Sequence, residues 1–400
     1  MKKIVLVLGN YKNGGMATRA TNLSNEFAKY GYSVDILVTR EMGNSFFSTA
    51  DNVEVVPIKE YNSDPGHVKH LDDRKIRDKK IKQIKRVRLF TKHFKKLDHY
   101  LSKKVKMLRC GVELRDYFLN TQPDIVIPFG IAYLEPLISA SNGIDCQIVY
   151  AEKNAPELEF PKKSSDEFNY YIKILKRIHG VVVQTDNERQ FFDGALTNIY
   201  VINNPVKQGL PQPYTGKRKK TIVNFCRMSA QKNLELLIDA FVRIVEEYKD
   251  YKLLIYGNTV EESEIKYKES IIKKINVLGL KDSVYVLPPA ADVHKRVLDS
   301  AMFVSSSDYE GLSNSMIEAM AIGLPCICTD CLGGGPREVM VDEVNGLIVP
   351  MNDVEALYKA MKRFIENPIF AEQCGKKAAQ IREKLDVKKI ARDWINMFQG

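Results

Sequence analysis

The sequence predicts an α/β protein made of two doubly wound domains that face each other across a cleft. Two observations lead to this prediction. Short apolar runs alternate with helical segments through most of the 400 residues, and this rhythm is interrupted once, between Asn203 and Lys220. A chain of this length exceeds one ordinary domain, and two alternating βα series joined by a linker indicate two parallel sheets.

The first series occupies residues 1–203. It opens with a continuous apolar run over residues 3–9, which is typical of a strand buried on both faces. A glycine-bearing loop over residues 10–15 follows, then a helix from about Met16 to Tyr30 and a second strand over residues 33–39. This order of strand, glycine loop, helix and strand predicts a parallel βαβ unit.

Residues 204–220 are expected to form a linker, because they are rich in proline and glycine and poor in apolar side chains. The second domain is then expected over residues 221–385, where the alternation restarts. A final helix over residues 386–400 carries one apolar stripe of Ile390, Trp394 and Phe398. We expect this helix to cross back and pack on the first domain.

Composition excludes several classes of protein. No run approaches the roughly 20 apolar residues that a membrane-spanning helix needs. Seven scattered cysteines in a long chain favour a reducing cytosol over a disulfide framework. Cys326, Cys328 and Cys331 lack the spacing and the histidine partners of a metal site, and Cys326 and Cys328 lie within an apolar run that is interpreted as a strand, so no metal is expected.

The net charge of +10 comes from one segment. Residues 74–109 hold 16 lysines and arginines against Asp78 and Asp98, a local charge of +14. Apolar residues recur every three to four positions from Lys75 to Lys106, which predicts an amphipathic helix with a cationic face. The helix could dock on anionic lipid or could pack on the sheet with a solvated face. Nucleic-acid binding is not expected, because the aromatic residues do not form a stacking platform.

The chemistry is expected around the stretch from Glu310 to Pro325, which reads EGLSNSMIEAMAIGLP. Gly311, Leu312 and Ser313 lead into a helix whose first backbone N–H groups can bind an anion. If Glu310 caps this helix, Glu318 lies two turns along on roughly the same face. Two carboxylates on one face are suited to accept hydrogen bonds from sugar and ribose hydroxyls.

This stretch resembles the E-x7-E motif, with its trailing A-x-A-x-G-x-P, of family four of the retaining glycosyltransferases, also called glycosyl transferases group one. The resemblance implies the GT-B fold, in which two Rossmann-like domains face each other. It also implies that Glu310 holds the donor sugar, that Glu318 holds the nucleotide ribose, and that the amides of residues 311–313 lie near the diphosphate.

Phe225 to Asn233, which reads FCRMSAQKN, resembles the G-R-x-x-x-x-K segment of the same family. Arg227 and Lys232 would bind the diphosphate and stabilise the leaving nucleotide, so together with Glu310 they are the predicted catalytic residues. Cys226 stands where the family usually has glycine, which leaves both cations in place but changes the local turn.

Two loops of the first domain complete the predicted site. Gly14 and Gly15 open the first helix, where glycine permits close approach to a ligand, and in the family this loop faces the donor phosphates. Glu152 and Asn154 follow a strand and stand in a loop where many members carry histidine near the sugar. We assign no role to His179 or His294.

The predicted function is therefore transfer of a sugar from a nucleotide-sugar donor, with UDP as the expected nucleotide, to a hydroxyl of a glycan or lipid-linked acceptor. Retention of configuration and a role in cell-surface polysaccharide synthesis are implied by the resemblance. No cofactor is expected, because no D-x-D triplet follows a strand and the nucleotide sugar is a substrate. The alternatives are an epimerase or phosphorylase of the same fold, or a non-enzymatic membrane- or nucleic-acid-binding protein. The expected location is the cytoplasm, at the inner face of a membrane.

Overall fold

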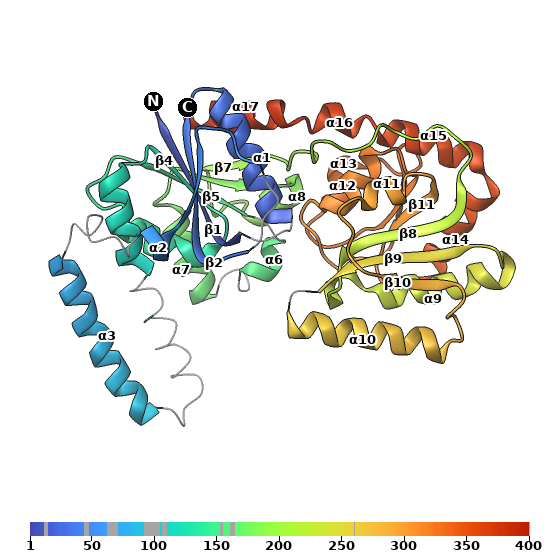
Figure 1. Cartoon of the computed structure of the whole chain (residues 1–400), viewed down its shortest axis with the longest axis horizontal. Coiled ribbons are helices and arrows are strands. Elements are labelled where there is room, and N and C mark those ends of the chain that lie inside the picture. Colours follow the sequence, from blue (N-terminus) through green and yellow to red (C-terminus); the bar gives the residue numbers. More distant parts are fainter. Residues whose placement is uncertain are drawn as a thin grey trace.

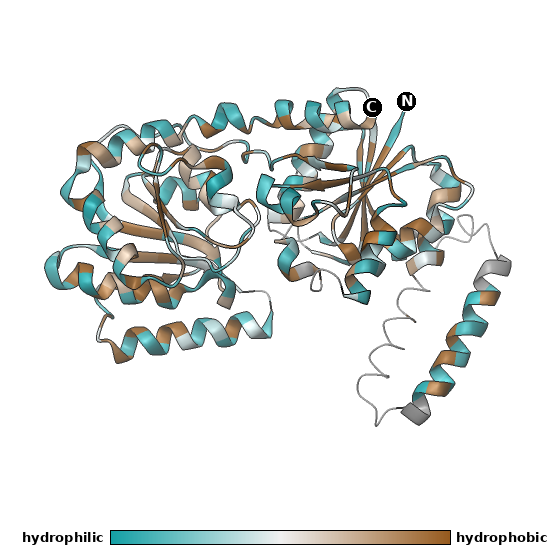
Figure 2. Cartoon of the chain, turned by 180° about the vertical axis from the view of Figure 1, so that it is seen from behind, coloured by the Kyte–Doolittle hydropathy of each residue, from teal (hydrophilic) through white to brown (hydrophobic). Residues whose placement is uncertain are grey.

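The computed structural model describes residues 1–11, 15–43, 48–61, 71–91, 105, 110–152, 155–160, 165–259 and 261–399. These residues form two domains, each built on a parallel sheet and joined at a common boundary (Figure 1). Figure 2 shows that the strands of both sheets are the apolar interior, while the exposed helix surfaces are mixed or polar. The predicted fold of two doubly wound α/β domains is confirmed.

The first sheet has seven strands in the order β3-β2-β1-β4-β5-β6-β7, and every pairing is parallel. Strand β1 lies at the centre, and its side chains alternate between two apolar cores on the two faces of the sheet. The strand order reverses beside β1, and ligands bind outside the carboxyl ends of the strands at such a switch point. The strands are β1 (Lys3–Tyr11), β2 (Ser33–Met42), β3 (Val53–Pro57), β4 (Ile125–Pro128), β5 (Gln147–Ala151), β6 (Gly180–Val183) and β7 (Ile199–Val201).

Helices of the first domain connect these strands and cover both faces. The first of them, α1, begins at Gly15, directly after the loop that leaves β1. The others are α2 (Ile58–Tyr61), α3 (Leu71–Thr91), α5 (Leu134–Ala140), α6 (Pro156–Glu159), α7 (Asp166–Leu175) and α8 (Asp186–Phe191), with α1 spanning Gly15–Lys29 and a 3-10 turn at Ile131–Tyr133.

The second sheet has six parallel strands in the order β10-β9-β8-β11-β12-β13. They are β8 (Lys219–Arg227), β9 (Lys252–Asn258), β10 (Val284–Leu287), β11 (Ser300–Ser305), β12 (Cys326–Thr329) and β13 (Leu347–Val349). The helices are α9 (Leu234–Glu247), α10 (Glu262–Val277), α11 (Val293–Arg296), α12 (Asn314–Ala321), α13 (Gly335–Val339), α14 (Val354–Glu366), α15 (Pro368–Ala378) and α16 (Ile381–Lys384), followed by α17 (Val387–Gln399).

The chain crosses between the domains twice. It first crosses after β7 ends at Val201, and β8 begins at Lys219, two residues before the expected start of the second domain. It returns along α16 and α17, and α17 packs on α1 of the first domain (Figure 1). The rings of Phe27 on α1 and Phe398 on α17 meet edge to face at 6.0 Å, and Trp394 is fully buried.

The basic segment is described only in part. Helix α3 spans Leu71–Thr91, within the segment predicted to be helical, and residues 92–104 and 106–109 lie outside the described residues, so the extension of the helix to Lys106 stays a prediction. Figures 1 and 2 show α3 standing away from the body of the first domain. Among the helices that the structure describes, none is both long enough and apolar enough to cross a bilayer.

Candidate active site

Glu318 lies on α12, which follows β11 and packs its small apolar side chains into the core. This packing leaves the Glu318 side chain 18% exposed. Its Oε2 lies 2.7 Å from Nε2 of His294, on the short helix α11. His294 is buried in turn, with its ring 5.5 Å from the ring of Phe225. The histidine therefore fixes the orientation of the carboxylate, a role that no motif in the sequence had indicated.

Glu310 stands in the loop between β11 and α12. The expectation that it caps α12 is wrong, because the N-cap residue is Ser313 and the helix begins at Asn314. The Glu310 carboxylate instead forms an ion pair with Lys232 and accepts a hydrogen bond of 3.0 Å from the hydroxyl of Ser307. Glu310 and Glu318 thus lie on different structural elements, one on a loop and the other on the helix.

Lys232 ends a 3-10 turn between β8 and α9, where Asn233 adopts the left-handed conformation with φ 42°. The ion pair with Glu310 is well shielded, since the two side chains are 13% and 12% exposed. Burial is the largest single influence on the pKa of Lys232 and lowers it, but the charge of Glu310, its hydrogen bond to the lysine and the nearby Cys226 together outweigh burial, so the net pKa is raised. The lysine is therefore a fixed positive charge at neutral pH.

Arg227, at the end of β8, is the more exposed of the two predicted cations, with 55% of its side chain accessible. Its Nε lies 3.3 Å from Oε1 of Glu264 on α10, and its Nη2 lies 3.4 Å from Oε1 of Gln231. Arg227 is close enough to Lys232 to oppose the charge on that lysine. A cavity of about 530 Å³ lies beside it, lined also by Tyr309, the residue before Glu310.

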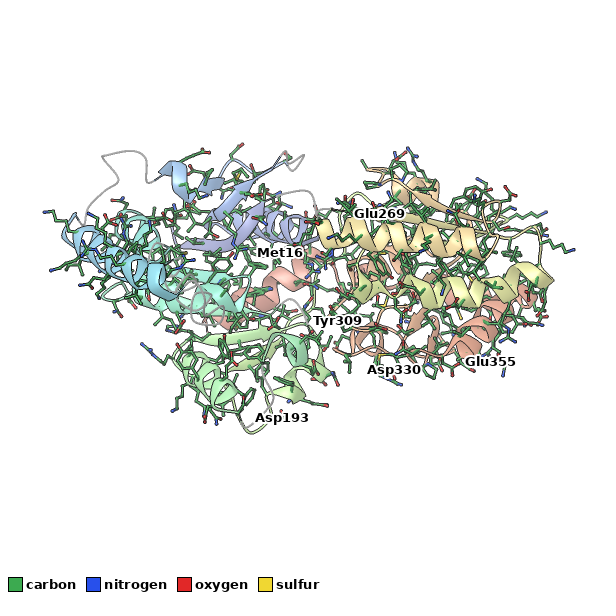
Figure 3. All side chains as sticks on the ribbon, turned by 90° about the horizontal axis from the view of Figure 1, so that it is seen from below. Met16, Asp193, Glu269, Tyr309, Asp330 and Glu355 are labelled. Atoms are coloured by element: carbon green, nitrogen blue, oxygen red, sulfur yellow. The ribbon has the colours of Figure 1, made fainter. Side chains whose placement is uncertain are left out.

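The segment from Gly311 to Ser313 is buried where the two domains meet. A Cβ atom on Gly311 would lie 2.7 Å from both Gln184 Nε2 and Glu188 Oε1 of the first domain, so the close approach requires glycine. The carbonyl of Leu312 accepts a hydrogen bond of 3.3 Å from Nδ2 of Asn204. Figure 3 shows Met16 and Tyr309 at this boundary between the domains.

Gly15 faces the same boundary from the first domain. A Cβ atom there would lie 2.2 Å from Nδ2 of Asn314, the first residue of α12, so the start of α1 directly meets the start of α12. Gly14, the other predicted glycine, lies outside the described residues. The structure therefore brings one predicted loop of the first domain against the predicted donor segment.

Arg19, four residues after Gly15, was not among the predicted site residues. Its Nε donates to Oδ1 of Asn314 at 3.0 Å, and its Nη1 donates to Oε1 of Gln184 at 3.2 Å. Burial lowers the pKa of Arg19 to about 10, while the charges of Glu310 and Glu318 act in the opposite direction. A third cation thus lies close to both carboxylates. One arginine in an otherwise ordinary helix carries no sequence signal.

The predicted acceptor loop is only partly described. Glu152 follows the end of β5, is 2% exposed, and accepts a hydrogen bond of 2.7 Å from the hydroxyl of Tyr150. Asn154 lies outside the described residues. His179 lies elsewhere, where its Nδ1 accepts from the amide of Ile148 at 3.1 Å, which is a structural contact.

The triple-glycine segment joins the domains. The hydroxyl of Thr185 donates to the carbonyl of Gly333 at 2.8 Å, and Glu338 accepts from the amide of Asp186 at 3.0 Å and from Nδ2 of Asn203 at 3.1 Å. These bonds run between the domains, and a cavity of about 320 Å³ lies beside them.

No group of three or more His, Cys, Asp or Glu side chains suited to a metal occurs among the residues that the structure describes. Cys326 and Cys328 lie in β12, as predicted, and all seven cysteines are free. Burial raises the pKa of Cys331 to about 12, which keeps this thiol protonated and a poor metal ligand. The absence of a metal requirement stays a prediction.

Comparison with known proteins identifies the second domain. Residues 211–381 match the family described as Glycosyl transferases group 1. They form a glycosyl transferases group 1 domain. That domain contains Arg227, Lys232, Glu310 and Glu318, so these predicted residues fall within the matched region.

Individual relatives match over part of their length. A poly(ribitol-phosphate) alpha-N-acetylglucosaminyltransferase of Staphylococcus aureus is 29% identical over 237 residues, which cover 58% of this chain and 46% of the relative. An N-acetylgalactosamine-N,N'-diacetylbacillosaminyl-diphospho-undecaprenol 4-alpha-N-acetylgalactosaminyltransferase of Campylobacter jejuni is 30% identical over 183 residues, covering 46% of this chain and 47% of the relative. The chain thus spans about half the length of these relatives.

Solved structures share the whole architecture. TarM of S. aureus has a TM-score of 0.78 at 19% identity, with coverage of 100% of this chain and 99% of TarM. HepE of Anabaena, solved with UDP-glucose, has a TM-score of 0.69 at 17% identity and covers 100% of both chains. The group 1 domain and its partner domain together therefore have the GT-B fold.

Proposed function

We propose that the protein is a glycosyltransferase that moves a sugar from a UDP-sugar to a hydroxyl of a glycan or lipid-linked acceptor. One observation carries the proposal. Lys232, Glu310 and Glu318 come from separate parts of the group 1 domain, and they gather beside the start of α12, where Gly15 of the first domain approaches. Fixed charges at the boundary of two domains are suited to a ligand that carries both hydroxyls and phosphates.

Each residue has a distinct role in the proposed site. Glu318, held by His294, accepts hydrogen bonds from the ribose hydroxyls. The backbone N–H groups at the start of α12 lie where they can bind the diphosphate, because Ser313 makes no capping bond that would occupy them. Lys232 stabilises the charge that develops on the departing diphosphate, and Arg227 adds to it from the cavity side. When the donor binds, Glu310 gives up its ion pair with Lys232 and accepts a hydrogen bond from a hydroxyl of the sugar.

The reaction breaks the bond between the sugar C1 and the diphosphate oxygen, and the electron pair stays on the nucleoside diphosphate. The acceptor oxygen forms the new bond to C1, and its proton is taken up by the departing diphosphate or by solvent. Retention requires that the acceptor oxygen arrive on the face from which the diphosphate leaves. The acceptor would therefore approach from the first domain, near Gly15 and Glu152.

The names of the relatives support a role in cell-surface polysaccharide synthesis. The S. aureus relative is named for poly(ribitol-phosphate) and the C. jejuni relative for a diphospho-undecaprenol substrate. Such acceptors are anionic or lipid-linked. Helix α3 supports a place for this protein at a membrane, because Lys79, Lys80, Lys82, Lys85 and Arg86 are all exposed on it. Two apolar residues of α3, Ile76 and Val87, are also 55% and 50% exposed.

The test is turnover with a panel of nucleotide sugars. Release of the nucleoside diphosphate is measured with and without a polyprenyl-linked glycan or poly(ribitol phosphate), and the anomeric configuration of the product is read by NMR. Lys232→Gln should lower turnover by roughly 100-fold or more, as expected for a group that stabilises a departing charge. Lys220→Gln is the matched control, since Lys220 is an exposed lysine of the same domain that pairs with Asp250.

Other outcomes would contradict the proposal. An epimerase would interconvert nucleotide sugars without acceptor, and a phosphorylase would require inorganic phosphate in place of a nucleotide sugar. Wild type that neither binds nor turns over any member of the panel would refute the assignment outright. Activity that EDTA abolishes and manganese restores would refute the cofactor-free form of the mechanism.

A further inference from the structure

Arg19 is the residue through which the first domain reaches the charged cluster of the second. It lies in the second turn of α1, and its guanidinium is held between two side-chain amides. One is Asn314, the first residue of α12 in the group 1 domain, at 3.0 Å, and the other is Gln184, which follows β6 in the first domain, at 3.2 Å. The two amides fix the position of the guanidinium on both sides of the domain boundary.

Both of these hydrogen bonds go to neutral groups, so neither neutralises the charge of Arg19. A guanidinium has five N–H donors, and these two bonds use one on Nε and one on Nη1. Arg19 is half-buried, and removing part of a cation from water costs free energy unless an opposite charge lies close to it. The nearby carboxylates are Glu310, Glu318 and Glu188, and each favours the charged form of Arg19.

The position of Arg19 relative to Glu310 and Glu318 indicates which anionic group of a ligand it would bind. In the proposed function, Glu318 holds the ribose and Glu310 the sugar, so the diphosphate that connects them lies between the two. Arg19 interacts electrostatically with both carboxylates, and it donates a hydrogen bond to Asn314, the first residue of α12. A planar guanidinium matches phosphate oxygens in pairs, which makes arginine suited to that place.

We propose that Arg19 binds the diphosphate of the nucleotide-sugar donor, as a phosphate-binding residue contributed by the domain opposite Arg227 and Lys232. The proposal rests on the proposed function and extends it. The diphosphate then has cations on both sides, two from the group 1 domain and one from α1. A bound donor would therefore connect the two domains. Its affinity should fall when Arg19 on α1 no longer contacts the diphosphate.

The experiment measures dissociation constants by calorimetry for wild type and variants. A panel of nucleoside diphosphates first finds the one that binds wild type most tightly, and the matching monophosphate and nucleoside complete the series. Arg19→Gln should weaken the diphosphate on the order of 10- to 100-fold, as expected for loss of a charge-assisted hydrogen bond, and leave the nucleoside within about twofold. The diphosphate affinity of Arg19→Lys should lie between those of wild type and Arg19→Gln, because lysine keeps the charge but lacks the planar pair of donors.

Lys29→Gln is the matched control, because Lys29 lies on the same helix α1 and pairs only with its neighbour Glu26 in the described structure. It should leave all three affinities unchanged. Melting temperatures of the unliganded variants establish that each is folded, and Arg19→Lys keeps the test informative if Arg19→Gln is not.

The outcomes separate the two proposals. If no nucleoside diphosphate binds wild type, the proposed function fails and the role of Arg19 fails with it. If Arg227→Gln weakens the diphosphate and neither Arg19 variant does, the donor site stands and the role of Arg19 is refuted. If the Arg19 variants weaken nucleoside and diphosphate equally, Arg19 only ties the domains together. Unchanged donor affinity with a raised KM for a phosphate-bearing acceptor would place Arg19 on the acceptor instead, which also overturns the proposal.

Discussion

Nε2 of His294 lies 2.7 Å from Oε2 of Glu318, and the two residues reach each other from different helices, α11 and α12. The side chains are 7% and 18% exposed, so the bond is largely shielded from water. The carboxylate that is proposed to hold the ribose is therefore positioned by a residue 24 places earlier in the chain.

His294 should matter for nucleotide binding only through Glu318. His294→Phe should weaken UDP on the order of tenfold, because the carboxylate loses the bond that orients it. His294→Gln, which can still donate to Glu318, should restore most of the affinity. The measurement is calorimetry with UDP and with 2',3'-dideoxy-UDP. Equal losses for the two nucleotides would show that His294 acts on the fold and not on the ribose contact.

The ion pair of Lys232 and Glu310 should contribute to stability before any donor binds. Removing one partner leaves a shielded charge alone, which costs about 3 to 5 kcal/mol in comparable pairs. Lys232→Met and Glu310→Gln should each lower the melting temperature, and the double variant should lose less than the two together. Lys220→Gln breaks an exposed pair that water screens, so it should leave the melting temperature nearly unchanged. Additive losses in the double variant would contradict the coupling.

The same pair gives a pH dependence with a defined sign. The pKa of Lys232 is raised above its ordinary 10.5, so its contribution to stability is complete below that value and is lost as the pH rises through the raised pKa. The difference in melting temperature between wild type and Lys232→Met should thus stay constant from pH 6 to 9, because both values lie below 10.5. A difference that shrinks within this window would be inconsistent with a charged lysine.

Helix α3 should bind anionic vesicles. Wild type should sediment with vesicles that contain phosphatidylserine or phosphatidylglycerol, and less so at 1 M salt, where the screening length falls to about 3 Å. Changing Lys79, Lys80, Lys82, Lys85 and Arg86 to Gln should release the protein and leave UDP affinity unchanged. The control changes five exposed lysines of the second domain in the same way: Lys249, Lys273, Lys281, Lys376 and Lys377. Wild type that never sediments would show α3 to be a solvated structural element.

Two thiols beside the site should be unreactive. Burial raises the pKa of Cys226 and of Cys331 to about 12, so at pH 8 only on the order of one molecule in 10,000 carries the reactive thiolate at either position. Iodoacetamide at pH 8 should leave both unmodified in the folded protein and alkylate both in urea, as read by peptide mass spectrometry. Rapid alkylation of the folded protein would contradict the raised pKa of these thiols.

Periodicity and local motifs predicted the fold because both are properties of short stretches. The apolar run at residues 3–9 became the central strand β1, and the small residues after Glu310 became the buried helix α12. Arg227 and Lys232 were predicted together from their resemblance to one family motif, yet the structure gives them different partners, Glu264 and Glu310. A motif places two residues near each other in the chain but does not determine the direction of each side chain.

Contacts between residues far apart in the chain could not be predicted, because periodicity and motifs describe only short stretches. His294 and Arg19 meet Glu318 and Asn314 only because two helices and two domains pack together, and neither residue stands in a recognisable pattern. The capping role of Glu310 failed because three residues intervene before the helix begins.

The packing of α17 on α1 has a consequence for synthesis of the chain on the ribosome. Phe27 is fully buried, and part of its cover is Phe398, which is made 371 residues later. Until α17 emerges, α1 has an uncovered apolar face, although every strand of its own sheet is already available. The packing around the helix that carries Gly15 and Arg19 is therefore completed only after α17 has been made, so this part of the first domain matures after the synthesis of the whole group 1 domain.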